Sequence, residues 1–206
     1  NGAGKTTTFN LAVGNLKPDK GDILMNKKYI TNLPLHSRAR KGLGYLTQEA
    51  SIFRDLTVKE NIDLALQNSS SSSAVIRNRR EKIINEFNLN NFVDNFGFQL
   101  SGGERRRCEI ARALSVGRKG PKYLLLDEPF AGIDPLAVND LKKLIRKLSK
   151  TGVGILITDH NVRETLLITN KSYVMSEGRI LAYGSSSELA NDPIVKKYYL
   201  GDNLKL

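Results

Sequence analysis

Asn1-Gly-Ala-Gly-Lys-Thr6 opens the sequence, and Tyr123-Leu-Leu-Leu-Asp127-Glu128 lies beyond its middle. The first stretch is most of the phosphate-binding pattern G-x-x-x-x-G-K-[ST], in which glycines let consecutive backbone N–H groups point at phosphate oxygens. The second is an apolar run that ends in two carboxylates, as a strand buried on both faces would. Ligands of parallel sheets bind at the carboxyl ends of the strands. The two stretches together therefore predict an α/β fold of the P-loop NTPase class.

The glycine-rich stretch carries the expected phosphate contacts. Lys5 would neutralise the β- and γ-phosphates, and the hydroxyl of Thr6 would coordinate Mg²⁺. Further nucleotide contacts are expected along the loop and the start of the helix that follows it, at Asn1, Gly2, Ala3, Gly4 and Thr7. Taken alone, the stretch could also be a glycine-rich turn that caps a helix. The first glycine of the pattern belongs two residues before Asn1, so we expect a chain shortened at its N-terminus, without the strand that leads into the loop.

The two carboxylates after the apolar run suit metal and acid–base chemistry. Charges at a buried strand end are costly unless they serve a cation or a reaction. We expect Asp127 to hold Mg²⁺ through water, and Glu128 to be the general base that polarises the attacking water. An acidic turn without a catalytic role is the alternative interpretation.

A second helix start is rich in glycine but has no lysine of its own: Leu100-Ser-Gly-Gly-Glu104. Its Ser-x-x-Glu spacing is a capping box, which by itself needs neither glycine. Bare amides at a helix N-terminus form an anion site. If each nucleotide lies between two chains, the phosphate loop of one and this segment of the other are both used, so we expect a homodimer. The expected nucleotide contacts here are Ser101, Gly102, Gly103 and Glu104.

Three single residues complete the candidate site. Gln48 follows the expected strand Gly42–Thr47 and could reach the metal and the reaction, although a lone glutamine is commonly a surface residue. Asp134 precedes a proline, and it is either a helix cap alone or also part of the nucleotide site. His160 follows the expected strand Val153–Thr158 and could contact the γ-phosphate and the attacking water; single histidines are more commonly structural.

Hydrophobic periodicity predicts alternating strands and helices around these motifs. Besides those named above, strands are expected at Asp22–Met25, Tyr123–Leu126, Lys171–Ser176 and Arg179–Tyr183, the last two as a hairpin. Helices are expected at Lys5–Val13, from Thr57 to Leu66, at Ala74–Phe87, Arg105–Leu114 and Asn161–Ile168, and after Asp134-Pro135; the Ser-rich stretch Asn68–Ser73 reads as a surface loop. We expect a parallel-sheet core in residues 1–48 and 104–206, interrupted by a helical insertion at 49–103.

The composition is that of a globular protein, with 40% hydrophobic and 26% charged residues among 206. No run approaches the roughly 18 apolar residues of a membrane-spanning helix, and no secretory signal is recognisable. The single Cys108 excludes an internal disulfide and fits a reducing cytosol. The net charge of +11 could indicate nucleic acid or an anionic membrane surface, but no aromatic residues interleave with the basic runs. We expect no nucleic-acid partner.

These motifs, in this order, resemble those of the ABC ATPase family. They correspond to its Walker A loop, Gln48 loop, Leu100–Glu104 signature, Walker B strand, Asp134 loop and His160 switch. The resemblance implies a RecA-like core with an inserted helical subdomain. It also implies a head-to-tail dimer that closes on two molecules of ATP, hydrolyses them with Mg²⁺, and drives two membrane-embedded permease subunits through their coupling helices.

Longer stretches resemble the branch of this family that powers lipopolysaccharide export in Gram-negative bacteria. By this resemblance, Phe53 and Arg54 would line the groove that receives the coupling helices, and the protein would act at the cytoplasmic face of the inner membrane. Phe53 could otherwise be a core aromatic residue. The segments that carry the likeness are Leu33–Arg40, Gly44–Arg54, Leu100–Arg107, Asp127–Pro135, Ile157–Leu166 and Tyr199–Asp202.

Other functions stay open from the sequence. The ATPase of a branched-chain amino-acid importer has similar motifs. A DNA-associated ABC ATPase would suit the net charge of +11, but such proteins separate the motif halves with a long coiled coil, and no sustained heptads are present here. A nucleotide-binding regulator without hydrolysis conflicts with Glu128.

Overall fold

The computed structural model describes residues 2–68 and 72–196. Three parallel strands form its central sheet, in the order β3-β4-β5. Because all three run the same way, the segments that follow them leave from one edge of the sheet, which we call the carboxyl edge. The strands are β3 (Leu43–Leu46), β4 (Tyr123–Asp127) and β5 (Gly154–Thr158).

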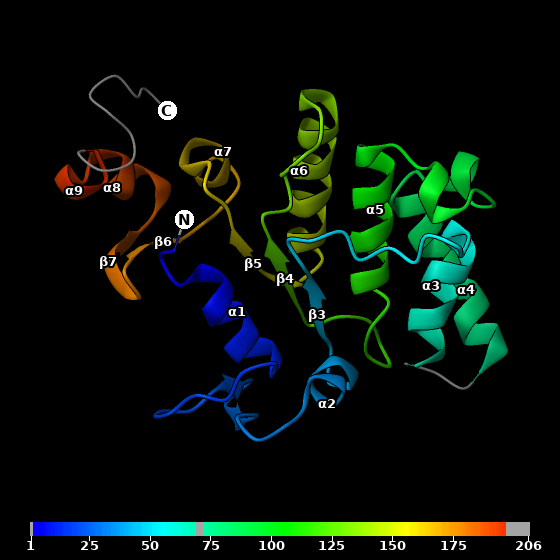
Figure 1. Ribbon diagram of the computed structural model, residues 1–206, viewed down its shortest axis with the longest axis horizontal. Helices are drawn as coiled ribbons and strands as arrows, with labels where there is room; N and C mark the ends of the chain where they lie inside the picture. The colour runs from blue at the N-terminus through cyan, green and yellow to red at the C-terminus, as the bar shows by residue number, and fades with distance from the viewer. Residues whose placement is uncertain (1, 69–71, 197–206) are drawn as a thin grey trace.

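Helices cover both faces of this sheet: α1 (Lys5–Val13) on one face, α5 (Gly102–Ala113) and α6 (Pro135–Lys150) on the other (Figure 1). On the α1 face, Phe9 packs with Leu125, whereas its neighbours in β4 point at α5 and α6. Successive strand residues face opposite ways, so a strand covered on both sides must be apolar throughout. The run that ends at Asp127 meets this requirement.

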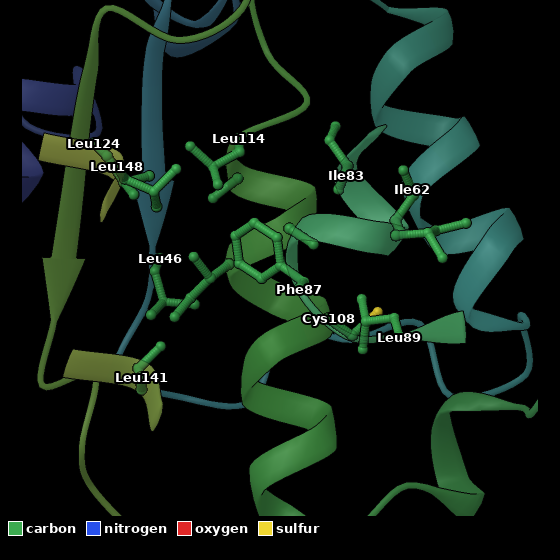
Figure 2. Close-up of a cluster of buried hydrophobic side chains, with 14 of the residues drawn as sticks. Leu46, Ile62, Ile83, Phe87, Leu89, Cys108, Leu114, Leu124, Leu141 and Leu148 are labelled. Atoms are coloured by element: carbon green, nitrogen blue, oxygen red, sulfur yellow. The ribbon is translucent and has the colours of Figure 1, made fainter. Parts of the chain in front are cut away.

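The residues between β3 and α5 form a helical segment on the far side of α5 from the sheet (Figure 1). One hydrophobic cluster runs from the sheet through α5 into this segment. Figure 2 shows Leu46 and Leu141 on the sheet side of α5 and Ile62 and Ile83 on the other. The segment contains α3 (Val58–Gln67), α4 (Ser73–Glu86) and two short 3₁₀ turns, Asn90–Phe92 and Gly97–Gln99.

Smaller elements flank the sheet. Two hairpins are formed by β1 (Leu24–Met25) with β2 (Lys28–Tyr29), and by β6 (Ser172–Ser176) with β7 (Arg179–Gly184). Short helices complete the described chain: α2 (Leu35–Arg40), α7 (Val162–Leu166), α8 (Ser186–Asn191) and α9 (Pro193–Val195). No helix within residues 2–68 and 72–196 is both long enough and apolar enough to cross a bilayer.

A buried arginine joins α1 to the chain that follows it. Arg38 is 1% exposed, and its guanidinium donates to the backbone carbonyls of Leu11, Ala12, Thr31 and Leu33 at 2.7–2.8 Å. Two of these carbonyls lie at the C-terminal end of α1, where a helix needs donors. The helix that begins at the phosphate loop is therefore anchored at its far end.

Sheet and helix come closest where β3 passes α5. A Cβ added to Gly44 would lie 2.3 Å from the carbonyl oxygen of Ala113. That distance is shorter than any real carbon–oxygen contact, so only glycine fits at this crossing.

The expected strands β3, β4, β5, β6 and β7 are confirmed to within one residue at each end, and so is the helix Lys5–Val13. Helix α5 begins three residues before the expected Arg105, because Ser101 is its N-cap. The strand expected at Asp22–Met25 is shorter, and its partner β2 was not foreseen; the turn between them holds Asn26 and Lys27 at positive φ of 52° and 61°. Of the serine-rich loop, residues 69–71 lie outside the described residues, as do Asn1 and Tyr199–Asp202.

The buried thiol tests the packing of α5. Cys108 is 0% exposed, and burial raises the pKa of its thiol to about 12. Because the thiolate is the reactive species, we expect no reaction with a thiol reagent at pH 8 in the native state and one equivalent after denaturation. Absorbance after addition of Ellman's reagent measures both. Fast labelling of the native protein would contradict the packing.

Candidate active site

The phosphate loop presents a helix start without side-chain caps. Gly4 is the N-cap of α1 at φ 94°, no side chain among the described residues caps the amides of the first turn, and that turn has no acidic residue. The amides are therefore free for an anion at the positive end of the helix dipole. The carbonyl of Ala3 accepts a hydrogen bond from Gly178 N–H (3.1 Å), which holds the loop against the β6–β7 turn. Thr6 and Thr7 are exposed.

Three expected catalytic side chains meet at the carboxyl edge of the sheet. Glu128 directly follows β4, and its Oε2 lies 3.3 Å from Gln48 Nε2 and 3.5 Å from His160 Nδ1. Glu128 has a φ of 45°, which is unusual for a residue with a side chain. Such backbone strain is tolerated where the surrounding structure fixes it, commonly at functional sites. The arrangement suits a carboxylate that accepts a proton and is oriented by two neighbours.

Asp127 is the most buried carboxylate of the site, at 1% exposure. Its Oδ1 accepts the hydroxyl of Thr158, and its Oδ2 has no partner among the described residues. An unpaired buried carboxylate oxygen is costly unless a cation or an ordered water satisfies it. No group of three or more His, Cys, Asp or Glu side chains within the described residues could hold a metal ion. This donor set fits Mg²⁺, which keeps most of its water and takes one or two carboxylates plus phosphate oxygens.

The signature segment forms its capping box and packs on α6. Ser101 N–H donates to the Glu104 carboxylate (2.8 Å), and Glu104 N–H donates to Ser101 Oγ (3.4 Å). A Cβ added to Gly103 would lie 2.9 Å from Ala137 Cβ, and one added to Gly102 would lie 3.2 Å from a backbone oxygen. The two glycines therefore allow close packing on α6, in addition to leaving the amides at the helix start uncovered. The Asp134 carboxylate caps α6 through Ala137 N–H (2.9 Å).

A buried ion pair on α5 joins these parts, and the sequence analysis missed it. Arg106 and Glu109 are 5% and 2% exposed, and Arg106 Nη1 lies 3.1 Å from Glu109 Oε2. The guanidinium also donates to the carbonyls of Thr47, Asp127, Glu128 and Pro129 at 2.9–3.2 Å. One side chain thus fixes the backbone beside Gln48 and the end of β4. The sequence did contain a signal for this pair: Arg106 and Glu109 are opposite charges spaced (i, i+3) on an otherwise buried face of the helix.

The other end of this ion pair reaches a groove of about 370 Å³ lined by Phe53 and Arg112. Glu109 Oε1 accepts the N–H groups of Ser51 and Ile52, at 2.8 and 3.2 Å. Phe53 is 48% exposed, with the Arg112 guanidinium 4.8 Å from its ring centre. Its exposure contradicts the alternative of a core aromatic residue. Arg54, also exposed, follows it in the chain.

The expected residues form separate groups within one chain. Gln48, Asp127, Glu128 and His160 lie together at the carboxyl edge, and Lys5 shares a cavity of about 500 Å³ with Thr158 and Asp159. The hydrogen bonds of Ser101 and Glu104 stay within their own capping box.

Comparison with known proteins identifies the family. A profile of the ABC transporter family matches residues 1–131. The chain belongs to the ABC transporter ATPase family. The chain is therefore an ATP-binding ATPase subunit. Its fold is similar to a nucleotide-free ATP-binding cassette from an ABC transporter, with a TM-score of 0.84, 28% identity, and coverage of 98% of this chain and 85% of the other.

Two relatives carry the same name. The lipopolysaccharide export system ATP-binding protein LptB of Escherichia coli strain K12 is 50% identical over 207 residues, covering 100% of this chain and 85% of that protein. LptB of Acidithiobacillus ferridurans is 48% identical over 206 residues, covering 100% and 84%. The fold is also similar to CbiO1 of Clostridium perfringens, part of an ABC transporter complex, at 30% identity and a TM-score of 0.83 over 96% of this chain and 79% of the other.

The carboxyl group of Asp159, next to His160, makes the stability of the protein depend on pH. Burial raises the pKa of Asp159 above its ordinary value, and the neighbouring Glu128 adds to the shift, against hydrogen bonds and His160 that lower it. A raised native pKa favours the protonated form, so the stability it contributes is present below the unfolded pKa of about 3.9 and is lost as the pH rises through the native pKa.

We therefore expect Asp159→Asn to be more stable than the natural protein at pH 7, with the gain shrinking as the pH falls toward about 3, where both forms are neutral. Urea denaturation at a series of pH values measures this difference. The exposed carboxylate of Asp140 gives a matched control, because Asp140→Asn should show no such trend. A gain for Asp159→Asn that is equal at both pH values would contradict the burial argument.

Proposed function

We propose that this ATPase powers the export of lipopolysaccharide from the inner membrane of a Gram-negative bacterium. The single observation that carries the hydrolytic part is the contact of Glu128 with Gln48 and His160 at the carboxyl edge, beside the unpaired oxygen of Asp127. The LptB name of relatives at 48–50% identity over the whole chain supports the export part.

The proposed reaction is an in-line displacement at the γ-phosphate of ATP. Glu128 accepts a proton from water as the water oxygen bonds to the γ-phosphorus, and the bond to the β–γ bridging oxygen breaks. Gln48 and His160 hold the Glu128 carboxylate, and His160 also faces the γ-phosphate. Lys5 and the bare amides from Gly2 to Thr7 offset the phosphate charge. Mg²⁺, when bound to Asp127, Gln48 and Thr6, supplies charge neutralisation of the β- and γ-phosphates.

A head-to-tail homodimer completes the site. Ser101, Gly102, Gly103 and Glu104 of one chain would contact the triphosphate that Lys5 of the other chain holds. The loop before α6 and the first turn of α6 would lie at this interface, because Asp134 and the 78%-exposed Leu136 are accessible there.

We propose a division of the chain into a RecA-like core at 1–48 and 104–206 and a helical subdomain at 49–103, which the membrane subunits contact. In the dimer, the groove beside Phe53 and Arg54 of each chain would receive a coupling helix of one of two LptF/LptG-like subunits. Phe53 would be the exposed aromatic anchor of this contact. The net charge of +11 is compatible with work at the cytoplasmic face of an anionic membrane.

Removal of the base tests the hydrolytic mechanism. We expect Glu128→Gln to lower the rate of phosphate release by a factor of about 10²–10⁴, since general-base catalysis contributes that much. It should still bind Mg-ATP and should accumulate as a dimer, which light scattering measures. Glu177→Gln, at an exposed turn, is the control. Undiminished turnover in Glu128→Gln would refute the assignment of the base.

The groove is tested by recovery of the membrane partners. We expect Phe53→Ala to weaken binding of the membrane subunits by about 2 kcal/mol, roughly thirtyfold, because an aromatic anchor leaves its pocket. ATP binding should persist. Phe98, which is 56% exposed, lies outside the groove lining, so Phe98→Ala should leave recovery unchanged. Co-purification of amino-acid permease subunits with the natural protein would instead support the importer function.

A further inference from the structure

His160 precedes a helix that is too short to hold its own position. Helix α7 has five residues, and isolated helices of that length do not form in water. Local hydrogen bonds make the His160 loop and α7 one unit: Asn161 N–H donates to Asp159 Oδ1 (2.8 Å), and Glu164 N–H donates to Asn161 Oδ1 (3.2 Å). Whatever fixes α7 therefore fixes the backbone of His160.

Two cationic side chains of α6, Lys142 and Arg146, lie one helical turn apart and bind α7 and the residue after it. We call these two contacts the clamp. Lys142 Nζ forms an ion pair with the carboxylate of Glu164, and Arg146 Nη2 donates to the carbonyl of Leu167 (2.8 Å), just beyond α7. Lys142 is only 9% exposed, and burial together with the nearby Arg146 lowers its pKa. Burying the charge of Lys142 costs free energy unless the charge stays paired, so the side chain is constrained in position. Its neighbour Lys143 has a side chain that is 77% exposed.

The first turn of the same helix packs on the signature. Gly103 approaches Ala137 so closely that a Cβ would lie 2.9 Å from it, and Gly102 lies similarly against Gly132 in the loop before α6. Helix α6 thus contacts the signature with its first turn and α7 with its middle. A 16-residue helix moves as a rigid element, so a displacement of its first turn would reach the part that contacts α7.

We infer that Lys142 is a positioning residue that links engagement of the signature to the placement of His160 beside Glu128. The inference rests on the proposed dimer, in which the signature of a chain contacts one nucleotide and its His160 contacts the other. Movement of the signature onto its nucleotide would carry α6, and through the Lys142–Glu164 ion pair α7, toward the second nucleotide. The clamp would thus make the two hydrolytic sites of the dimer dependent on each other.

Steady-state hydrolysis of ATP by the full chain tests this link. Lys142→Met keeps the length of the side chain and removes its charge. We expect its kcat to fall on the order of tenfold, because small misplacements of a catalytic group are costly, while the KM for ATP stays unchanged, since the phosphate loop is untouched. Lys143→Met should match the natural protein. The reversed pair, Lys142→Glu with Glu164→Lys, should regain most of the lost kcat.

A merely structural role of the ion pair would give a different pattern. Loss of kcat that the reversed pair does not restore, or an unchanged kcat in Lys142→Met, would overturn the inference. If Lys142→Met does not fold, Glu164→Gln removes the same ion pair from the less buried side. Absence of turnover in the natural protein would refute the proposed function. Amide exchange in residues 159–166 would then decide on the clamp, supporting it if faster in Lys142→Met than in Lys143→Met and refuting it if equal.

Discussion

The buried ion pair between Arg106 and Glu109 is the constraint on which the rest of the site depends. Removing two charges from water costs several kcal/mol per ion, which only close pairing and further hydrogen bonds offset. Here the arginine donates to the carbonyls at the end of β4, and the glutamate accepts the amides beside Phe53. Neither side chain can move without leaving buried groups unpaired. The ion pair therefore holds the carboxyl edge and the groove at a fixed separation.

Helix α5 extends this constraint to the signature. Its first residues are the glycines that follow Ser101, its middle carries Arg106 and Glu109, and its end passes under Gly44. In the proposed dimer, a single helix would therefore position the anion site for one nucleotide, the backbone around the Glu128 carboxylate for the other, and the rim of the groove. In a motor of this family, a displacement at the groove would reach both nucleotides through one element.

Local signals in the sequence predicted much of this arrangement. Capping boxes, the phosphate-loop glycines and the apolar run before Asp127 are short-range patterns, and the structure places those elements where expected. Contacts between distant segments were not predictable in the same way. Arg38 and Arg106 donate to backbone carbonyls up to 59 residues away. Every residue has such a carbonyl, so the sequence does not indicate which ones will be the partners. The raised pKa of Asp159 likewise depends on burial, which appears only when β5 is packed.

The crossing of β3 and α5 at Gly44 has a mechanical consequence. The contact there is between main-chain atoms, with no side chain that could change rotamer to absorb a shift. The C-terminal end of α5 is therefore held against β3, whereas the signature lies at the opposite end of the same helix. A movement of the signature during the ATPase cycle would then pivot about the crossing at Gly44, with the displacement largest at the end of α5 that faces the nucleotide.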